Sequence, residues 1–184
     1  MKGACFMNNK TLKIVTAALM AAMTCIATMI IKVPSPTSGY IHLGDGFVLL
    51  SGIILGPFYG GIAAGIGSMF ADLFSGYAGY APATFLIKAL AALAGGITFH
   101  VLNPFFSKPA FKTIPVLFAG ISGGILVTGG YFIFEAFIMG LGVPAALTGV
   151  PFNLVQNLFG IIVGVLLMPL LGKAQVVKEI MAKA

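Results

Sequence analysis

Ionisable residues are scarce in this sequence, and their positions are its first chemical signal. The chain has four acids, Asp45, Asp72, Glu135 and Glu179, and three of them fall in or beside long apolar segments. A charge within a bilayer-spanning segment is costly unless it is paired or hydrated, so such a residue is a functional candidate. Asp72 and Lys88 lie at the two ends of a stretch that joins two apolar segments. They either pair with each other or contact a ligand.

Further polar side chains occur near the ends of the apolar segments. An acid, a base, amides and tyrosines together suit a small aromatic heterocycle that carries hydroxyl groups, because they combine hydrogen bonding with ring stacking. We predict a substrate site formed by Tyr40, His42, Asp45, Asp72, Tyr77, Tyr80, Thr84, Lys88, Tyr131, Glu135, Asn153, Gln156 and Asn157.

Several of these residues also have a structural interpretation. His42 and Asp45 precede or open an apolar segment and can cap a helix there, since an acid stabilises a helix N-terminus. Tyr77 and Tyr80 can be membrane-interface residues instead of stacking partners. Glu135 has no partner nearby in the sequence, which favours a contact with a ligand.

The composition is that of an integral membrane protein. Of the 184 residues, 59% are hydrophobic and 8% are charged, with a mean hydropathy of +1.09. A soluble domain carries roughly 25% charged residues. The net charge of +6 comes from lysines scattered at segment ends, which argues against nucleic acid as a partner. The two cysteines are too few and too far apart for a metal motif, so we expect no metal and no cofactor.

Proline and glycine divide the chain into six predicted helices within one membrane domain, residues 1–184. The predicted breaks are 34–36, 56–57, 76–82, 103–109 and 140–151, each containing proline or glycine. The second helix is too short to span a bilayer vertically, since a span needs roughly 20 residues. The predicted helices are 12–31, 45–55, 58–75, 83–102, 114–139 and 152–171.

The distribution of lysines predicts the orientation. An even number of helices puts both termini on one side, and that side is predicted to be the cytoplasm because lysines gather there. The predicted site residues then fall in the outer half of the membrane, which indicates a pocket open to the outside and sealed below. A channel would need polar lining through its whole depth. The lysines on the cytoplasmic side are Lys2, Lys10, Lys13, Lys108, Lys112, Lys173, Lys178 and Lys183.

The first predicted helix carries a doubled strip of small residues, Ala17, Ala18, Ala21 and Ala22. Small residues four positions apart let another helix approach closely, either within the fold or from a partner membrane protein. The strip is near the predicted cytoplasmic end of the helix.

The segment from residue 40 to 96 contains a run of short motifs: Ile41-His42-Leu43-Gly44-Asp45-Gly46, Leu55-Gly56-Pro57, Ala71-Asp72-Leu73, Tyr80-Ala81-Pro82-Ala83-Thr84 and Ile87-Lys88. Together they resemble the substrate-binding S component of energy-coupling factor (ECF) vitamin transporters, in the branch linked to riboflavin, pyridoxine-type vitamins or hydroxymethylpyrimidine. The resemblance implies a vitamin bound at the extracellular side of a prokaryotic cell membrane. It also implies a transmembrane T component and two cytoplasmic ATPases as partners, with the alanine strip as the docking surface.

Two other functions have weaker support in the sequence. The sequence Gly120-Ile121-Ser122-Gly123 matches an intramembrane serine protease motif, but no histidine follows Ser122 to act as its base, so we do not expect an enzyme. A self-sufficient secondary transporter would show an inverted repeat, and none is apparent. The chain has no phosphate-binding loop, so active transport would need ATPases on other polypeptides.

Overall fold

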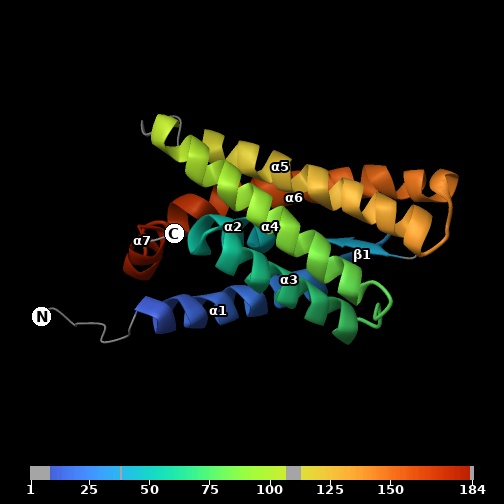
Figure 1. Ribbon diagram of the computed structural model, residues 1–184, viewed down its shortest axis with the longest axis horizontal. Helices are drawn as coiled ribbons and strands as arrows, with labels where there is room; N and C mark the ends of the chain where they lie inside the picture. Colours follow the sequence, from blue (N-terminus) through green and yellow to red (C-terminus); the bar gives the residue numbers. More distant parts are fainter. Residues whose placement is uncertain (1–8, 38, 107–112, 183–184) are drawn as a thin grey trace, which may run out of the picture.

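The computed structural model describes residues 9–37, 39–106 and 113–182, which form a helical bundle with one short β-hairpin (Figure 1). The hairpin pairs β1 (Lys32–Pro34) with β2 (Tyr40–His42) in antiparallel register, with Lys32 opposite His42. The helices are α1 (Asn9–Ile30), α2 (Asp45–Leu55), α3 (Pro57–Phe74), α4 (Ala81–Leu102), η1 (Asn103–Phe106), α5 (Ile114–Ile133), the π-helical turn η3 (Phe134–Ile138), α6 (Val143–Leu171) and α7 (Gln175–Met181).

The helices have the length and surface of a membrane protein. Four stretches of the described chain are long and apolar enough to cross a bilayer: Lys10–Ile30, Ala81–Phe106, Ile114–Ile138 and Val143–Leu171. Large apolar side chains also face outward along them, as Ile30 and Leu166 do. Lipid, not water, suits such a surface. The predicted helical membrane fold is confirmed, with the second helix short as expected.

Helix α2 lies at the centre of the bundle and packs against α3, α4 and α6. Its contact with α4 is a backbone contact, because a side chain on Gly52 would meet the carbonyl of Ala92. Gly56, with a φ of 81°, ends α2 in a conformation that glycine adopts without steric cost, and Pro57 opens α3. The predicted break at 56–57 is therefore confirmed, and Gly52 serves internal packing.

The start of the last long helix was predicted wrongly. The sequence prediction placed residues 140–151 in a break and began the helix at residue 152, whereas α6 begins at Val143. Gly142, with a φ of 80°, provides the turn, and Pro144 occupies the first helical turn, where its missing N–H costs nothing. Pro151 lies inside the helix, which is tolerated in membrane helices more often than in soluble ones.

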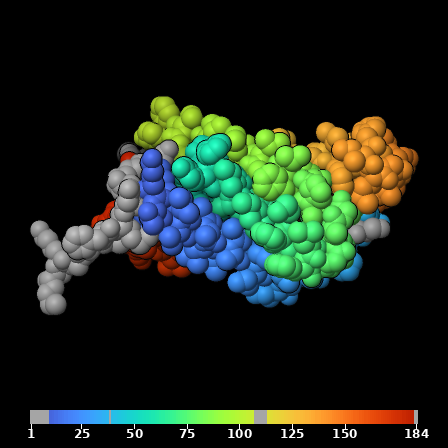
Figure 2. Space-filling model, turned by 60° about the horizontal axis from the view of Figure 1, so that its bottom comes forward, coloured from blue at the N-terminus to red at the C-terminus, as the bar shows by residue number. Residues whose placement is uncertain are grey.

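Four features were not predicted: the β-hairpin, the short helix η1, the π-helical turn after α5 and the short helix α7. The hairpin and the α3–α4 and α5–α6 connections gather at one end of the bundle, while the start of α1 and α7 lie at the opposite end (Figure 1). Helix α1 runs along the outside of the bundle beside α3 (Figure 2). The hairpin end is where the polar side chains meet.

Candidate functional site

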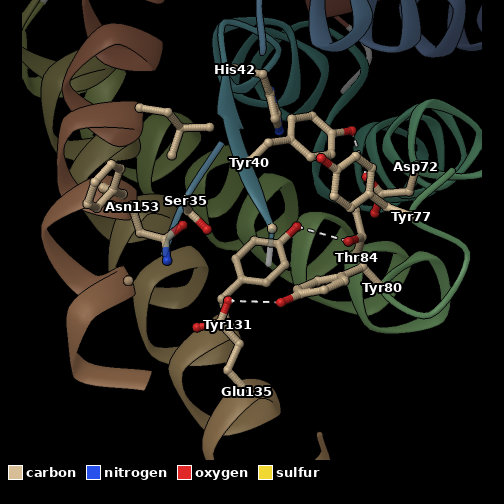
Figure 3. A pocket seen from close by; sticks show the side chains of 14 residues that line it. Ser35, Tyr40, His42, Asp72, Tyr77, Tyr80, Thr84, Tyr131, Glu135 and Asn153 are labelled. Atoms are coloured by element: carbon tan, nitrogen blue, oxygen red, sulfur yellow. Dashed lines mark hydrogen bonds between the residues drawn. The ribbon is translucent and has the colours of Figure 1, made fainter. Parts of the chain in front are cut away.

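A pocket with about 400 Å³ of empty space, including its open mouth, lies at the hairpin end of the bundle (Figure 3). The hairpin, the α3–α4 region, α5 and α6 all contribute to its wall. The predicted residues that line it are Tyr40, His42, Asp72, Tyr77, Tyr80, Thr84, Tyr131, Glu135 and Asn153.

Other lining residues were missed by the sequence analysis. Ser35, Gly39 and Ile41 belong to the hairpin, Gly149 belongs to the part of α6 that was predicted as a break, and Phe152 is the first residue of the helix as predicted. The signal that could have found the first group is the Pro34-Ser35-Pro36 sequence, which suits a turn close to predicted site residues. Gly149 required the correct start of α6.

Tyrosine rings form much of the wall. The rings of Tyr40 and Tyr77 have centroids 4.5 Å apart at an interplanar angle of 45°. Tyr80 packs edge-on against Phe134, with centroids 5.3 Å apart, and lies 6.4 Å from the ring of Tyr131. Such aromatic walls can hold a flat ligand by stacking.

Two buried carboxyl groups lie in the same wall. Tyr40 donates its hydroxyl proton to Asp72 Oδ1 at 2.7 Å, and Thr37 donates to Glu135 Oε1 at 2.7 Å. The Tyr80 hydroxyl bonds the Thr37 carbonyl at 2.6 Å and lies 3.4 Å from Glu135 Oε1. Glu135, which had no partner nearby in the sequence, is therefore held by Thr37 of the hairpin loop and by Tyr80 of the α3–α4 connection.

The hydroxyl groups of Thr84 and Tyr131 link α4 to α5 across the pocket. They share a hydrogen bond of 3.0 Å, and Thr84 also faces Asp72. Glu135 itself lies in the π-helical turn that follows α5. Turns of this kind often mark functional sites, because the extra residue redirects a side chain out of the regular helical face.

Of the two alternatives for Asp72 and Lys88, pairing with each other is wrong. Lys88, fully buried, makes an ion pair of 2.5 Å with Asp45 at the start of α2, and Gln156 donates to the other Asp45 oxygen at 2.9 Å. The pairing alternative rested on closeness in sequence. Lys88 lies almost two turns along α4 from Ala81, and helix packing brings it to the first residue of α2.

Asp45 therefore does not cap α2 with its side chain, because both of its oxygens are used by Lys88 and Gln156. The amide oxygen of Gln156, Oε1, accepts the His42 backbone N–H at 2.9 Å. Asp45, Lys88 and Gln156 are thus placed behind the pocket wall instead of lining it.

His42 fulfils part of the predicted capping role. Its Nδ1 accepts the backbone N–H of Gly44, immediately before α2, at 3.0 Å. Burial and the nearby Lys88 ammonium lower the pKa of His42 to about 3. The imidazole is therefore neutral at physiological pH, as an Nδ1 acceptor must be.

The two asparagines of α6 have different environments. Asn153 lines the pocket, but Asn157 donates to the Gly124 carbonyl at 2.9 Å and to Thr128 Oγ1 at 2.8 Å. Asn157 thus joins α6 to α5 outside the pocket. Residues four apart lie on the same side of a helix, yet these two asparagines contact different neighbours.

The alanine strip of α1 also divides into two sets. Ala17 and Ala21 pack against the apolar cluster around Met20 and Leu50, whereas Ala18 and Ala22 are exposed. Ala21 also faces α3 closely, because a side chain on Gly67 would meet its carbonyl oxygen. Only Ala18 and Ala22 are open to a partner.

Ser122 is a structural hydroxyl. It donates to the Ala119 carbonyl at 2.9 Å and accepts from Thr98 at 3.0 Å. These are the contacts of a polar side chain satisfied within a helix pair, and they do not resemble a nucleophile with its base.

Comparison with known proteins identifies the family. Residues 8–173 match the family model of the ECF-type riboflavin transporter, S component. An uncharacterised protein from the gap 3′ region of Pyrococcus woesei is 33% identical over 140 residues, which is 76% of this chain and 87% of that protein. The solved S component of a bacterial ECF transporter has the same fold, with a TM-score of 0.66 and 21% identity over 89% of this chain and 97% of that one. The chain therefore belongs to the S-component family of ECF-type riboflavin transporters, whose members are membrane transport subunits and not enzymes.

Proposed function

We propose that this chain binds a water-soluble vitamin at the hairpin end of the bundle and delivers it across the membrane with a T component and two cytoplasmic ATPases. The observation that carries the proposal is the one-sided placement of polar groups. The tyrosines, Asp72 and Glu135 surround a pocket at that end. Leu50, Ile53 and Ile54 continue the core below it as an apolar interior.

The proposed topology has six membrane helices, α1 to α6, with both termini in the cytoplasm of a prokaryotic cell and the pocket facing outward. Lys10 and Lys13 at the start of α1, and Lys173 and Lys178 beside α7, support it, since positive charge favours the cytoplasmic side. Of the other lysines used for this prediction, Lys2, Lys108, Lys112 and Lys183 lie outside the described residues.

The proposed ligand is riboflavin, a pyridoxine-type vitamin or hydroxymethylpyrimidine. Each has a flat heteroaromatic ring with polar substituents, which matches a wall of tyrosines, hydroxyls and carboxyl groups. The cavity itself has a volume of only about 30 Å³, well below the roughly 300–1,000 Å³ of typical small-molecule sites, so the pocket wall must open to admit such a ligand.

The proposed docking surface for the T component is the outer face of α1, which carries Ala18 and Ala22. Small exposed side chains on a lipid-facing helix allow a partner helix to approach closely. The inward-facing Ala17 and Ala21 contribute only by placing α1 close to the bundle. We therefore narrow the docking surface from four alanines to two.

The test is to purify the chain in mild detergent, identify any co-purified small molecule by mass spectrometry, and titrate that molecule back by calorimetry. The proposal expects a vitamin that rebinds, and no ATP hydrolysis by the isolated chain. Uptake into liposomes by the chain alone would favour a self-sufficient secondary transporter instead. ATPase activity that persists through purification to homogeneity would contradict the proposal outright.

A further inference from the structure

The pocket wall contains carboxylate oxygens that the protein leaves without a partner. Glu135 and Asp72 are both buried, with relative exposures of 3% and 4%. Glu135 Oε2 and Asp72 Oδ2 have no hydrogen-bond partner among the described residues. A buried acceptor without a donor costs about 1–3 kcal/mol, and more if it is charged, so a native protein seldom retains one without a function.

The position of Glu135 Oε2 shows what it faces. A side chain added to Gly149 would lie 3.0 Å from this oxygen, and Gly149 is itself part of the pocket lining. Glycine at this point therefore lets α6 approach the carboxyl group closely where the two meet at the pocket wall. The other oxygen accepts from Thr37 and lies 3.4 Å from the Tyr80 hydroxyl, so the carboxyl group is held in one orientation; Figure 3 draws the contact with Tyr80.

No lysine of the described chain pairs with either carboxyl group. The Lys88 ammonium is taken by Asp45. Lys32 is exposed, donates to Ser75 Oγ at 3.0 Å and lies near the ring of Tyr40. The pocket wall therefore carries two acids, while the buried pair behind it is neutral.

The aromatic wall favours a positive charge in the same place. Tyrosine faces attract cations through the ring quadrupole, most strongly where water is excluded. Two of these rings already have an ammonium group near them: Lys32 lies 5.7 Å from the Tyr40 centroid, and Lys88 lies 5.3 Å from that of Tyr131. Tyr77 and Tyr80 remain to face a ligand.

We infer that the pocket selects a heteroaromatic ligand that carries a positive charge, such as a protonated amine, which donates to Glu135 Oε2 and lies against the tyrosine rings. This inference rests on the proposed function and narrows it, because neither riboflavin nor pyridoxine carries an aliphatic amine that could donate a charged hydrogen bond to Glu135. A charged donor at this position supplies the missing hydrogen bond and favours the ionised form of the carboxyl group.

The experiment compares two probes that differ by one group. Pyridoxamine carries an amine where pyridoxine carries a hydroxyl, and riboflavin serves as a neutral three-ring probe. Calorimetry on the detergent-solubilised full chain at neutral pH should give about 10- to 100-fold tighter binding of pyridoxamine than of pyridoxine, the range expected for a charge-assisted hydrogen bond.

Glu135→Gln tests the carboxyl group itself. The amide keeps an oxygen that can accept from Thr37, so folding should be preserved, and a melting curve checks this. The variant should lose about 10- to 100-fold in affinity for pyridoxamine and less than about 3-fold for pyridoxine. The matched control is Glu179→Gln, which removes a negative charge from α7 at the other end of the bundle and should change neither affinity.

The failures can be told apart. Riboflavin or pyridoxine binding more tightly than pyridoxamine, with no loss in Glu135→Gln, would overturn the charge inference and leave the proposed vitamin transport intact. Binding of none of the three probes by a chain that melts cooperatively would overturn both.

Discussion

Replacement of Lys88 by methionine tests whether the buried pair with Asp45 holds the bundle together beneath the pocket. Lys88 is fully buried, and methionine occupies a similar volume, so the change mainly removes the ammonium group. Asp45 would keep Gln156 as a donor but would remain 93% buried, at 7% exposure, without a cation. Loss of one partner from a buried ion pair costs about 3–5 kcal/mol.

The expected shift in melting temperature follows from this cost. In a chain of this size, about 1 kcal/mol corresponds to roughly 2–4 °C, so Lys88→Met should lower the melting temperature by about 6–20 °C. Far-ultraviolet circular dichroism in detergent measures it. Lys178→Met, the same change on the exposed side of α7, is the control and should stay within about 0.5 kcal/mol of the parent.

A double variant separates lost pairing from poor packing. Asp45→Asn combined with Lys88→Met removes both charges, so it should recover much of the stability if the penalty comes from an uncompensated carboxylate. A double variant as unstable as Lys88→Met alone would refute the reasoning, and so would a shift below about 2 °C for the single variant.

Three further predictions address the pocket, the docking face and the hairpin. Gly149→Ala should weaken vitamin binding by about 1–3 kcal/mol, because its methyl group would lie 3.0 Å from Glu135 Oε2; unchanged calorimetric affinity would contradict this. Ala18→Leu should abolish uptake by the assembled transporter while vitamin affinity stays within about 2-fold, whereas Ala21→Leu should lower the melting temperature because that residue packs inward; normal uptake by Ala18→Leu would remove the docking assignment. The pKa of His42 is lowered from 6.5 to about 3, so the unfolded chain takes up a proton that the folded chain does not as pH falls below 6.5. The contribution of His42 to the free energy of unfolding should therefore be fully present above pH 6.5 and fall by about 2 kcal/mol by pH 5. His42→Gln should lose less stability than the parent when melting curves above pH 6.5 and at pH 5 are compared.

Local sequence signals predicted the features that local chemistry controls. The break at Gly56 and Pro57 was correct because a positive φ followed by a proline ends one helix and opens another whatever surrounds it. The same reasoning failed at Pro151, where a proline that would stop a helix in water lies within α6. A proline signal alone does not distinguish these two outcomes in a membrane.

The partners of the site residues could not be predicted in the same way. The pairing of Lys88 with Asp45 depends on how α4 packs on α2, and that contact is set by the absence of side chains on Gly52 and Gly96. Glu135 acquires Thr37 as a partner because the loop of the unpredicted hairpin reaches the π-helical turn after α5. Long-range packing decides such contacts, and a single sequence carries no direct record of it.

The buried ion pair beneath the pocket limits the routes by which a ligand can leave. Below the pocket wall lies the pair of Asp45 and Lys88, tied by Gln156 to the hairpin at His42. A path through the centre would have to separate that buried pair, at several kcal/mol, and then cross an interior formed largely by apolar side chains such as Leu50, Ile53 and Ile54. If the pocket faces outward as proposed, release towards the cytoplasm is less costly when the whole chain changes its orientation and the hairpin end opens. The apolar outer surface of α1, with two exposed alanines, is compatible with such movement against a partner, and the differential binding of that partner must supply the free energy.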